Sequence, residues 1–218
     1  PDAAADLLQS ARASHPDDVA LTVDLADALR ATDRFDEAAA AYHDALLRDP
    51  GNPDALAGLG TVHHARLELD EAVTSFRQAL ARVPKHPVAE TGLAWVLELI
   101  GDYQAALDHV EPCLGDPEPG WAISAAARLL RRLGRSAEAR QLLESADLQR
   151  MTPADRTSAL TTLGQVREDA GDYDAAFRAF TSANQCLPSR FDPAGFVRSV
   201  DRIIDFFSAD RWPTLPRS

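Results

Sequence analysis

Apolar residues recur along this chain at an interval of 34 positions. From starts at Val19, Pro53 and Pro87, each segment places a Leu beside a small residue, then a polar break and an aromatic residue, with Ala at constant offsets. On each side of the break the apolar residues lie three or four positions apart, which is the spacing of one helix face. The pattern therefore predicts successive pairs of antiparallel helices.

The small residues of the pattern have a packing purpose. Gly or Ala on the first helix and Ala on the second allow two helix axes to approach within about 8 to 10 Å. Aromatic side chains such as Tyr42, Phe76 and Phe180 are expected to fill the wedge between one helix pair and the next. Proline ends a second helix because it lacks an amide hydrogen and clashes with the preceding turn. The prolines in that place are Pro50, Pro84 and Pro188.

Two further units continue the pattern less regularly. The fourth begins at about Gly120 and keeps the small residues in step, but Ser136 stands where an aromatic residue is expected. The fifth begins at about Thr157 and restores the pattern with Leu163, Gly164, Tyr173, Ala176 and Phe180. The irregular spacing falls in loops, where changes of length cost little stability.

These segments resemble the tetratricopeptide repeat, whose 34-residue pattern joins an aromatic residue, Leu-Gly and Tyr with a later Ala, Phe, Ala and Pro. The resemblance implies an all-α, right-handed superhelical solenoid of helix pairs with a C-terminal capping helix. It places five repeats at 19–52, 53–86, 87–119, 120–156 and 157–188. Residues 1–18 match only the second helix of a repeat. Residues 189–218 form the expected capping helix and linker.

The tail after Pro188 has an apolar pattern of its own. Apolar residues at helical spacing predict an amphipathic helix that covers the exposed end of the stack; they are Phe196, Val200, Ile203, Ile204 and Phe207. The tail also resembles the junction in bacterial proteins that join tetratricopeptide repeats to a sulfotransferase domain. That resemblance implies a second hypothesis, in which the chain is a non-catalytic, substrate-presenting region and the catalytic domain lies beyond residue 218.

Charge and cysteine content narrow the classes of partner. The formal net charge of −12 argues against sequence-independent nucleic-acid binding, which depends on Lys and Arg neutralising phosphates. No apolar stretch is long enough to span a membrane. Cys113 and Cys186 fall in the second helices of the third and fifth units, two repeats apart. At the usual helix spacing we expect about 20 Å between them, beyond disulfide reach. Two reduced thiols fit a cytoplasmic protein.

Catalytic, cofactor and metal motifs are not found. The single lysine, Lys85, lies between Pro84 and His86 rather than in a phosphate-binding Gly-Lys-Ser or Gly-Lys-Thr sequence. The histidines are scattered, and the adjacent His63 and His64 would point about 100° apart on a helix. We therefore expect no catalytic residue, no cofactor and no metal in this chain, and a binding scaffold rather than an enzyme.

The resemblance implies that the first helices line a concave groove that binds a protein or peptide. The candidate groove residues are His64, Trp95, Trp121, Arg128, Arg131 and Gln165. Trp and Arg most often dominate binding energy, so Trp95 and Trp121 with the two arginines predict a site for an acidic peptide segment or a sulfated or phosphorylated ligand. A competing interpretation is that Trp121 only covers the degenerate junction between units. Exposed repeat ends further predict weak self-association.

Overall fold

A computed structural model of the chain describes residues 2–186. In this range it contains eleven α-helices and two short 3-10 helices. The first helices of the five pairs are α2 (Val19–Arg30), α4 (Pro53–Ala65), α6 (Pro87–Ile100), α8 (Gly120–Arg132) and α10 (Pro153–Asp169). The second helices are α3 (Phe35–Arg48), α5 (Leu69–Arg82), α7 (Tyr103–Val110), α9 (Ser136–Ser145) and α11 (Tyr173–Cys186). The remaining elements are α1 (Asp2–Ser14), η1 (Glu111–Gly115) and η2 (Leu148–Arg150).

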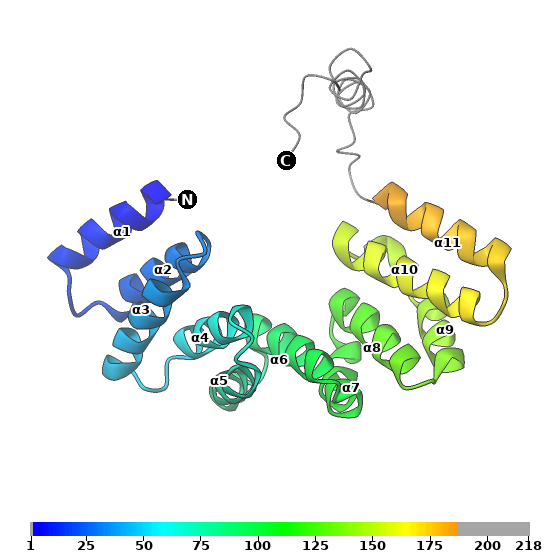
Figure 1. Cartoon of the computed structure of the whole chain (residues 1–218), viewed down its shortest axis with the longest axis horizontal. Coiled ribbons are helices and arrows are strands. Elements are labelled where there is room, and N and C mark those ends of the chain that lie inside the picture. The colour runs from blue at the N-terminus through cyan, green and yellow to red at the C-terminus, as the bar shows by residue number, and fades with distance from the viewer. Residues whose placement is uncertain (1, 187–218) are drawn as a thin grey trace, which may run out of the picture.

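The helix pairs stand side by side in a crescent (Figure 1). The first helices α4, α6, α8 and α10 line its inner side, while the second helices α3, α5, α7 and α9 form its outer side. Each helix packs on its neighbours along the chain, and α1 packs on α2 as the second helix of a half repeat would. The prediction of an all-α solenoid of helix pairs is confirmed. The predicted capping helix lies in 189–218, outside the described residues.

Small residues at the helix crossings hold the pairs together as the sequence predicted. Ala38, Ala72, Ala106 and Ala139 recur at one position of the second helices and are fully buried. The ring of Phe76 lies between two glycines on successive first helices. A Cβ atom on Gly60 would come within 2.8 Å of this ring, and one on Gly92 within 2.4 Å, so the ring occupies the space of both missing side chains. The wedge role of the aromatic residue is confirmed at this position.

Two details of the third and fifth pairs correct the sequence-based expectation. Helix α7 ends at Val110 and the chain continues as η1, so placing Cys113 in a second helix was wrong. Pro112 gives the reason, because it cannot donate the amide hydrogen that would extend α7. Helix α10 begins at Pro153, before residue 157, because the Thr152 side chain accepts a hydrogen bond from the Asp155 amide and caps the helix there.

Candidate functional site

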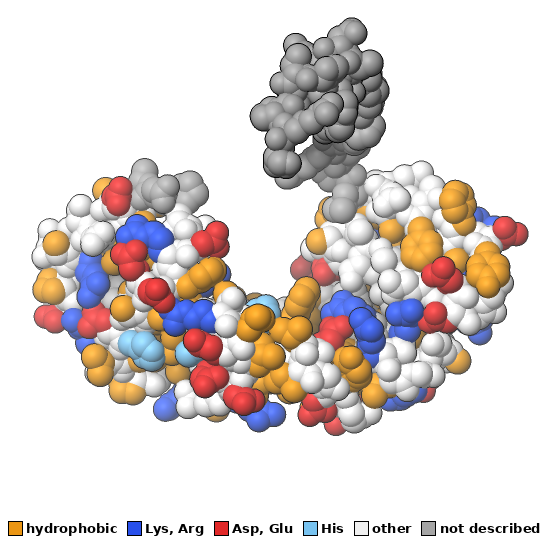
Figure 2. Space-filling view, in the orientation of Figure 1, with side chains coloured by type: hydrophobic (Ala, Val, Ile, Leu, Met, Phe, Trp, Pro, Cys, Tyr) orange, Lys and Arg blue, Asp and Glu red, His pale blue; other side chains and the backbone are white. Residues whose placement is uncertain are grey.

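An apolar stripe runs along the inner face of α6. Trp95 is 60% exposed, and Val88 and Leu99 on the same face are also largely exposed. Residues seven and four positions apart share one side of a helix, so the three side chains form a single row. Hydrophobic side chains gather over the middle of the crescent in Figure 2. Tryptophan is rarely left exposed without a role, so this row is the first candidate contact surface.

A pocket of about 300 Å³ lies beside this stripe, between α6, α8 and α10. Three small apolar side chains line it: Ala94, Ala125 and Ala154. The other lining residues carry two indole rings, hydroxyl groups, a guanidinium and a carboxylate, from Thr91, Trp95, Trp121, Ser124, Arg128, Asp155 and Ser158. The pocket therefore combines aromatic and small apolar surface with hydroxyl groups and two opposite charges, a composition that can hold a bulky side chain of a bound partner.

Arg128 is held in place at the edge of the pocket by a carboxylate from the neighbouring pair. Its Nε donates to Glu98 Oε1 at 2.8 Å, and its Nη2 donates to Oε2 at 2.8 Å. The guanidinium also stacks on Trp95, with 5.8 Å between its carbon and the ring centre. Two parallel hydrogen bonds to one carboxylate fix both charges in position. Arg128 thus links α8 to α6, and Glu98 balances its positive charge.

Arg131 is paired in the same way with the following pair of helices. Its Nε donates to Asp169 Oδ2 at 2.8 Å and its Nη2 to Oδ1 at 3.3 Å, so it links α8 to α10. The positive charges of Arg128 and Arg131 are therefore offset by Glu98 and Asp169. An anionic ligand at either guanidinium would therefore meet a positive charge that a neighbouring carboxylate already offsets, which weakens its attraction.

The structure brings together only part of the predicted set. Trp95, Trp121 and Arg128 line one pocket. His64 on α4 and Gln165 on α10 are half-buried and are not among its lining residues. Arg131 lies on α8 but points to Asp169. Sequence reasoning missed Ser124 and Ser158, since single serines on helices carry no signal until the neighbouring helices are placed.

Trp121 also lines a second pocket of about 400 Å³. This pocket lies between the loop at 117–119 and the loop at 147–152, the two places where the repeat spacing is irregular. Asp155 lines both pockets, as Trp121 does, so the two are neighbours. Trp121 therefore lines both the pocket between α6, α8 and α10 and the pocket at the irregular junction.

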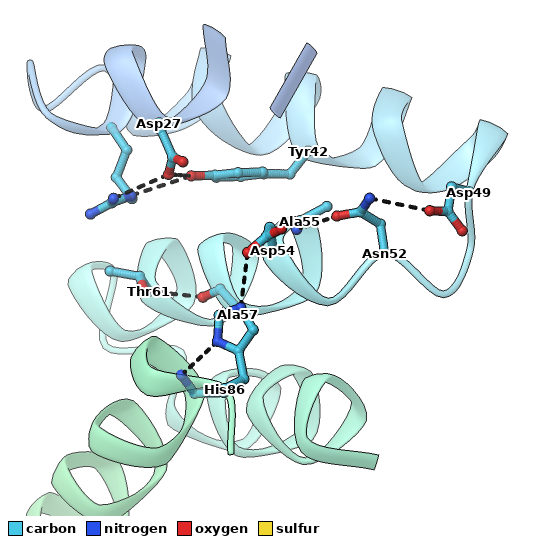
Figure 3. Close-up of polar contacts among 11 residues, drawn as sticks. Asp27, Tyr42, Asp49, Asn52, Asp54, Ala55, Ala57, Thr61 and His86 are labelled. Carbon is cyan, nitrogen blue, oxygen red and sulfur yellow. Dashed lines mark hydrogen bonds and ion pairs between the residues drawn. The ribbon is translucent and has the colours of Figure 1, made fainter. Parts of the chain in front are cut away.

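A third arrangement joins α2 to α3 in the first pair (Figure 3). The Tyr42 side chain is fully buried, and its hydroxyl donates a hydrogen bond to Asp27 Oδ1 at 2.6 Å. Arg30 Nε donates to the same hydroxyl at 3.3 Å, and Arg30 Nη2 donates to Asp27 at 3.1 Å. Burial, together with the bond to Asp27, raises the pKa of the Tyr42 hydroxyl, so it stays protonated. The three side chains satisfy one another and serve packing.

Cysteine and metal chemistry contribute little to the groove. Burial and the nearby Glu90 raise the pKa of the Cys113 thiol to about 11, so the thiolate is scarce near neutral pH. Within residues 2–186, no three His, Cys, Asp or Glu side chains come together in a way that could hold a metal ion. Among the described helices, none has both the length and the apolar character needed to cross a membrane.

Comparison with known proteins agrees with this architecture. One tetratricopeptide repeat family model matches residues 1–53, 23–87 and 65–111, and a second matches 120–145. No curated protein sequence matches the chain.

Solved structures of low sequence identity share the fold. PilF of Pseudomonas aeruginosa is 18% identical, with a TM-score of 0.68 over 79% of this chain and 78% of its own. YrrB, described as a tetratricopeptide repeat protein with an unusual peptide-binding site, is 20% identical, with a TM-score of 0.64 over 86% and 95%. MamA is 21% identical, with a TM-score of 0.63 over 74% and 94%. Since the first family model covers more than half of the 218 residues, the chain belongs to the tetratricopeptide repeat family.

Proposed function

We propose that this chain is a non-catalytic interaction scaffold that binds a segment of a partner protein along its inner, concave surface. A bulky apolar side chain of the partner lies on Trp95 and enters the pocket between α6, α8 and α10. The observation that carries the proposal is the 60% exposure of Trp95 beside that pocket. The peptide-binding site in the description of YrrB, a similar fold, supports the same type of ligand.

Energy considerations favour Trp95 as the anchor. Burying an aromatic side chain removes 150 to 250 Å² from water, and roughly 25 cal/mol is gained per Å² of apolar surface. The indole is already held from one side by Arg128, which Glu98 fixes in turn. This contact restricts the indole on one side, which lowers part of the entropic cost of binding.

The charge of the ligand is the finer part of the proposal. The sequence predicts an acidic, sulfated or phosphorylated ligand at Arg128 and Arg131, and in the structure both arginines are paired with carboxylates. The attraction of such a ligand is reduced because Glu98 and Asp169 already offset the two positive charges. We therefore assign the main affinity to the apolar contact and keep the anionic ligand as a prediction that the Arg128→Ala plus Arg131→Ala variant tests.

The proposal also concerns the cellular location of the chain and the sulfotransferase hypothesis. A cytoplasmic location fits the buried, protonated thiol of Cys113. The sulfotransferase hypothesis gains no support from the family models, which are models of the repeat alone.

A binding experiment with matched variants tests the proposed function. Peptides are first selected from a random displayed library on the wild-type chain, and one is titrated by calorimetry. We expect Trp95→Ala to weaken binding at least about tenfold, because an aromatic anchor in an interface typically contributes more than 1.4 kcal/mol. Leu47→Ala is the control, since Leu47 is 82% exposed on the outer helix α3. Equal affinities of wild type and Trp95→Ala would refute the assignment.

A further inference from the structure

The pocket of about 400 Å³ lies between two connections that depart from the regular repeat. Residues 49–52 and 83–86 join the earlier pairs directly, whereas the connections before α8 and α10 each include a short 3-10 helix, η1 or η2. Residues from both of these longer connections line the pocket. Binding residues are often carried by loops that a rigid scaffold positions, so this pocket is a candidate site in its own right.

The charged side chains of this pocket are mostly acidic. Three carboxylates line it, those of Glu118, Asp147 and Asp155, against one guanidinium, that of Arg150. Within residues 2–186, none of the three carboxylates takes part in an ion pair. The formal net charge of the chain, −12, has the same sign. The pocket therefore attracts a cationic group.

Two of the carboxylates are held in place by hydrogen bonds on one oxygen. The Thr152 hydroxyl donates to Asp155 Oδ2 at 2.7 Å, and the Gln149 amide donates to Asp147 Oδ1 at 3.2 Å. Among the described residues, no donor reaches the second oxygen of either side chain. Each carboxylate can therefore accept further hydrogen bonds from a ligand.

Apolar surface in the same pocket indicates which cation fits. Trp121 and Ile123 are half-buried and Met151 is 9% exposed, and all three line the pocket. An arginine side chain can lay its methylene stem on such a surface, stack its guanidinium on an indole and donate two parallel hydrogen bonds to a carboxylate. A metal ion fits less well, because no three potential ligand side chains of the described residues are grouped to hold one.

We propose that this pocket binds an arginine side chain of the same partner segment whose bulky apolar residue lies on Trp95. The inference rests on the proposed function for the identity of the partner and adds a second subsite with its own chemistry. Trp121 and Asp155 line both pockets, so the two subsites adjoin. An extended segment advances about 3.3 Å per residue, so residues a few positions apart can occupy both.

Peptide binding to charge-neutralised variants tests the subsite. Peptides selected from a random displayed library on the wild-type chain should carry arginine within a few positions of a bulky apolar residue. Replacing that arginine by citrulline, which keeps the shape and removes the charge, should weaken binding at least about tenfold, as expected for a hydrogen-bonded charged group. Glu118→Gln plus Asp147→Asn should cause a similar loss, and in this variant citrulline should cost little more.

A matched control removes the same number of charges elsewhere. Asp70→Asn plus Glu71→Gln changes two exposed carboxylates on the outer helix α5 and should bind the peptide as the wild type does. An equal loss in this control would overturn the proposal, because it would assign the effect to net charge alone. Selected peptides that lack arginine, or that bind equally well with citrulline, would overturn it too.

A small probe tests the pocket without any partner segment. Nα-acetyl-arginine amide is titrated into the ¹⁵N-labelled chain, and the indole NMR signal of Trp121, identified with Trp121→Phe, is followed. The arginine derivative should shift this signal, and the citrulline derivative should shift it at least about tenfold less at the same concentration. Equal shifts from the two derivatives would overturn the proposal.

The proposed function and this subsite can fail separately. A selected peptide that loses affinity in Trp95→Ala but not with citrulline would leave the apolar contact standing and remove the arginine subsite. A peptide that loses affinity with citrulline but not in Trp95→Ala would support the subsite and remove the assignment of Trp95.

Discussion

Substituting Gly92 by Ala probes the packing on which the crescent depends. The ring of Phe76 lies between Gly60 on α4 and Gly92 on α6, and an added Cβ at Gly92 would lie 2.4 Å from Phe76 Cζ. Phe76 is 1% exposed, so its ring has no route into solvent. Relief of the overlap therefore requires α5 and α6, or the ring and α4, to move apart.

Two opposing effects set how much Gly92→Ala changes the free energy of unfolding. In a helix interior, Ala is favoured over Gly by about 1 kcal/mol. Overpacking a filled core costs about 1 to 3 kcal/mol, and the short contact with a fully enclosed ring places this case at the upper end. We therefore expect Gly92→Ala to lower the free energy of unfolding by about 1 to 2 kcal/mol, which corresponds to a fall in Tm of about 2 to 8 °C for a chain of this length.

Urea denaturation followed by circular dichroism measures this change. Gly115→Ala is the matched control, because an added Cβ there meets no atom within 4 Å. In a Phe76→Leu background the cost of Gly92→Ala should shrink, since the smaller side chain leaves room for the new methyl group. If Gly92→Ala is as stable as the wild type or more stable, helix propensity outweighs the contact, and the wedge between α4 and α6 is not as described.

Two further predictions concern a helix cap and a thiol. His86 Nδ1 accepts a hydrogen bond from the Ala89 amide at 3.3 Å and caps α6 (Figure 3). In urea denaturation His86→Ala should therefore lower the free energy of unfolding by about 1 kcal/mol, while His86→Asn, which keeps an acceptor, should lower it less. Equal losses for the two variants would contradict the capping role. The pKa of the Cys113 thiol is raised to about 11, so its thiolate forms only as the pH rises toward that value. At pH 8 Cys113 should therefore react with a disulfide reagent at least about tenfold more slowly than Cys186. Equal rates for the two thiols would contradict the burial of Cys113.

The repeat register could be predicted from the sequence because it depends on local spacing. The alanines at Ala38, Ala72 and Ala106 recur every 34 residues, and each is buried at a helix crossing. The end of α7 at Val110 was visible in principle, since Pro112 follows, but the repeat pattern suggested a longer helix. A family pattern predicts the average unit and misses local interruptions of this kind.

The groove was harder to predict because its chemistry depends on contacts between repeats. Trp95 and Arg128 were both chosen from the sequence, and the structure places them in contact. The pairing of Arg128 with Glu98 was not predicted, although the two lie 30 positions apart, close to one repeat. This pair changes the expected ligand, because a guanidinium that is already neutralised attracts an anion weakly.

Photo-crosslinking tests most directly whether the concave surface is the binding site. A photoreactive amino acid is placed at Thr91, which lines the pocket beside Trp95, and in a second variant at Leu47 on the outer side. With a peptide selected on the wild-type chain, the account predicts efficient crosslinking from position 91 and background crosslinking from position 47. Crosslinking from position 47 alone would contradict it, because the partner would then bind the outer helices.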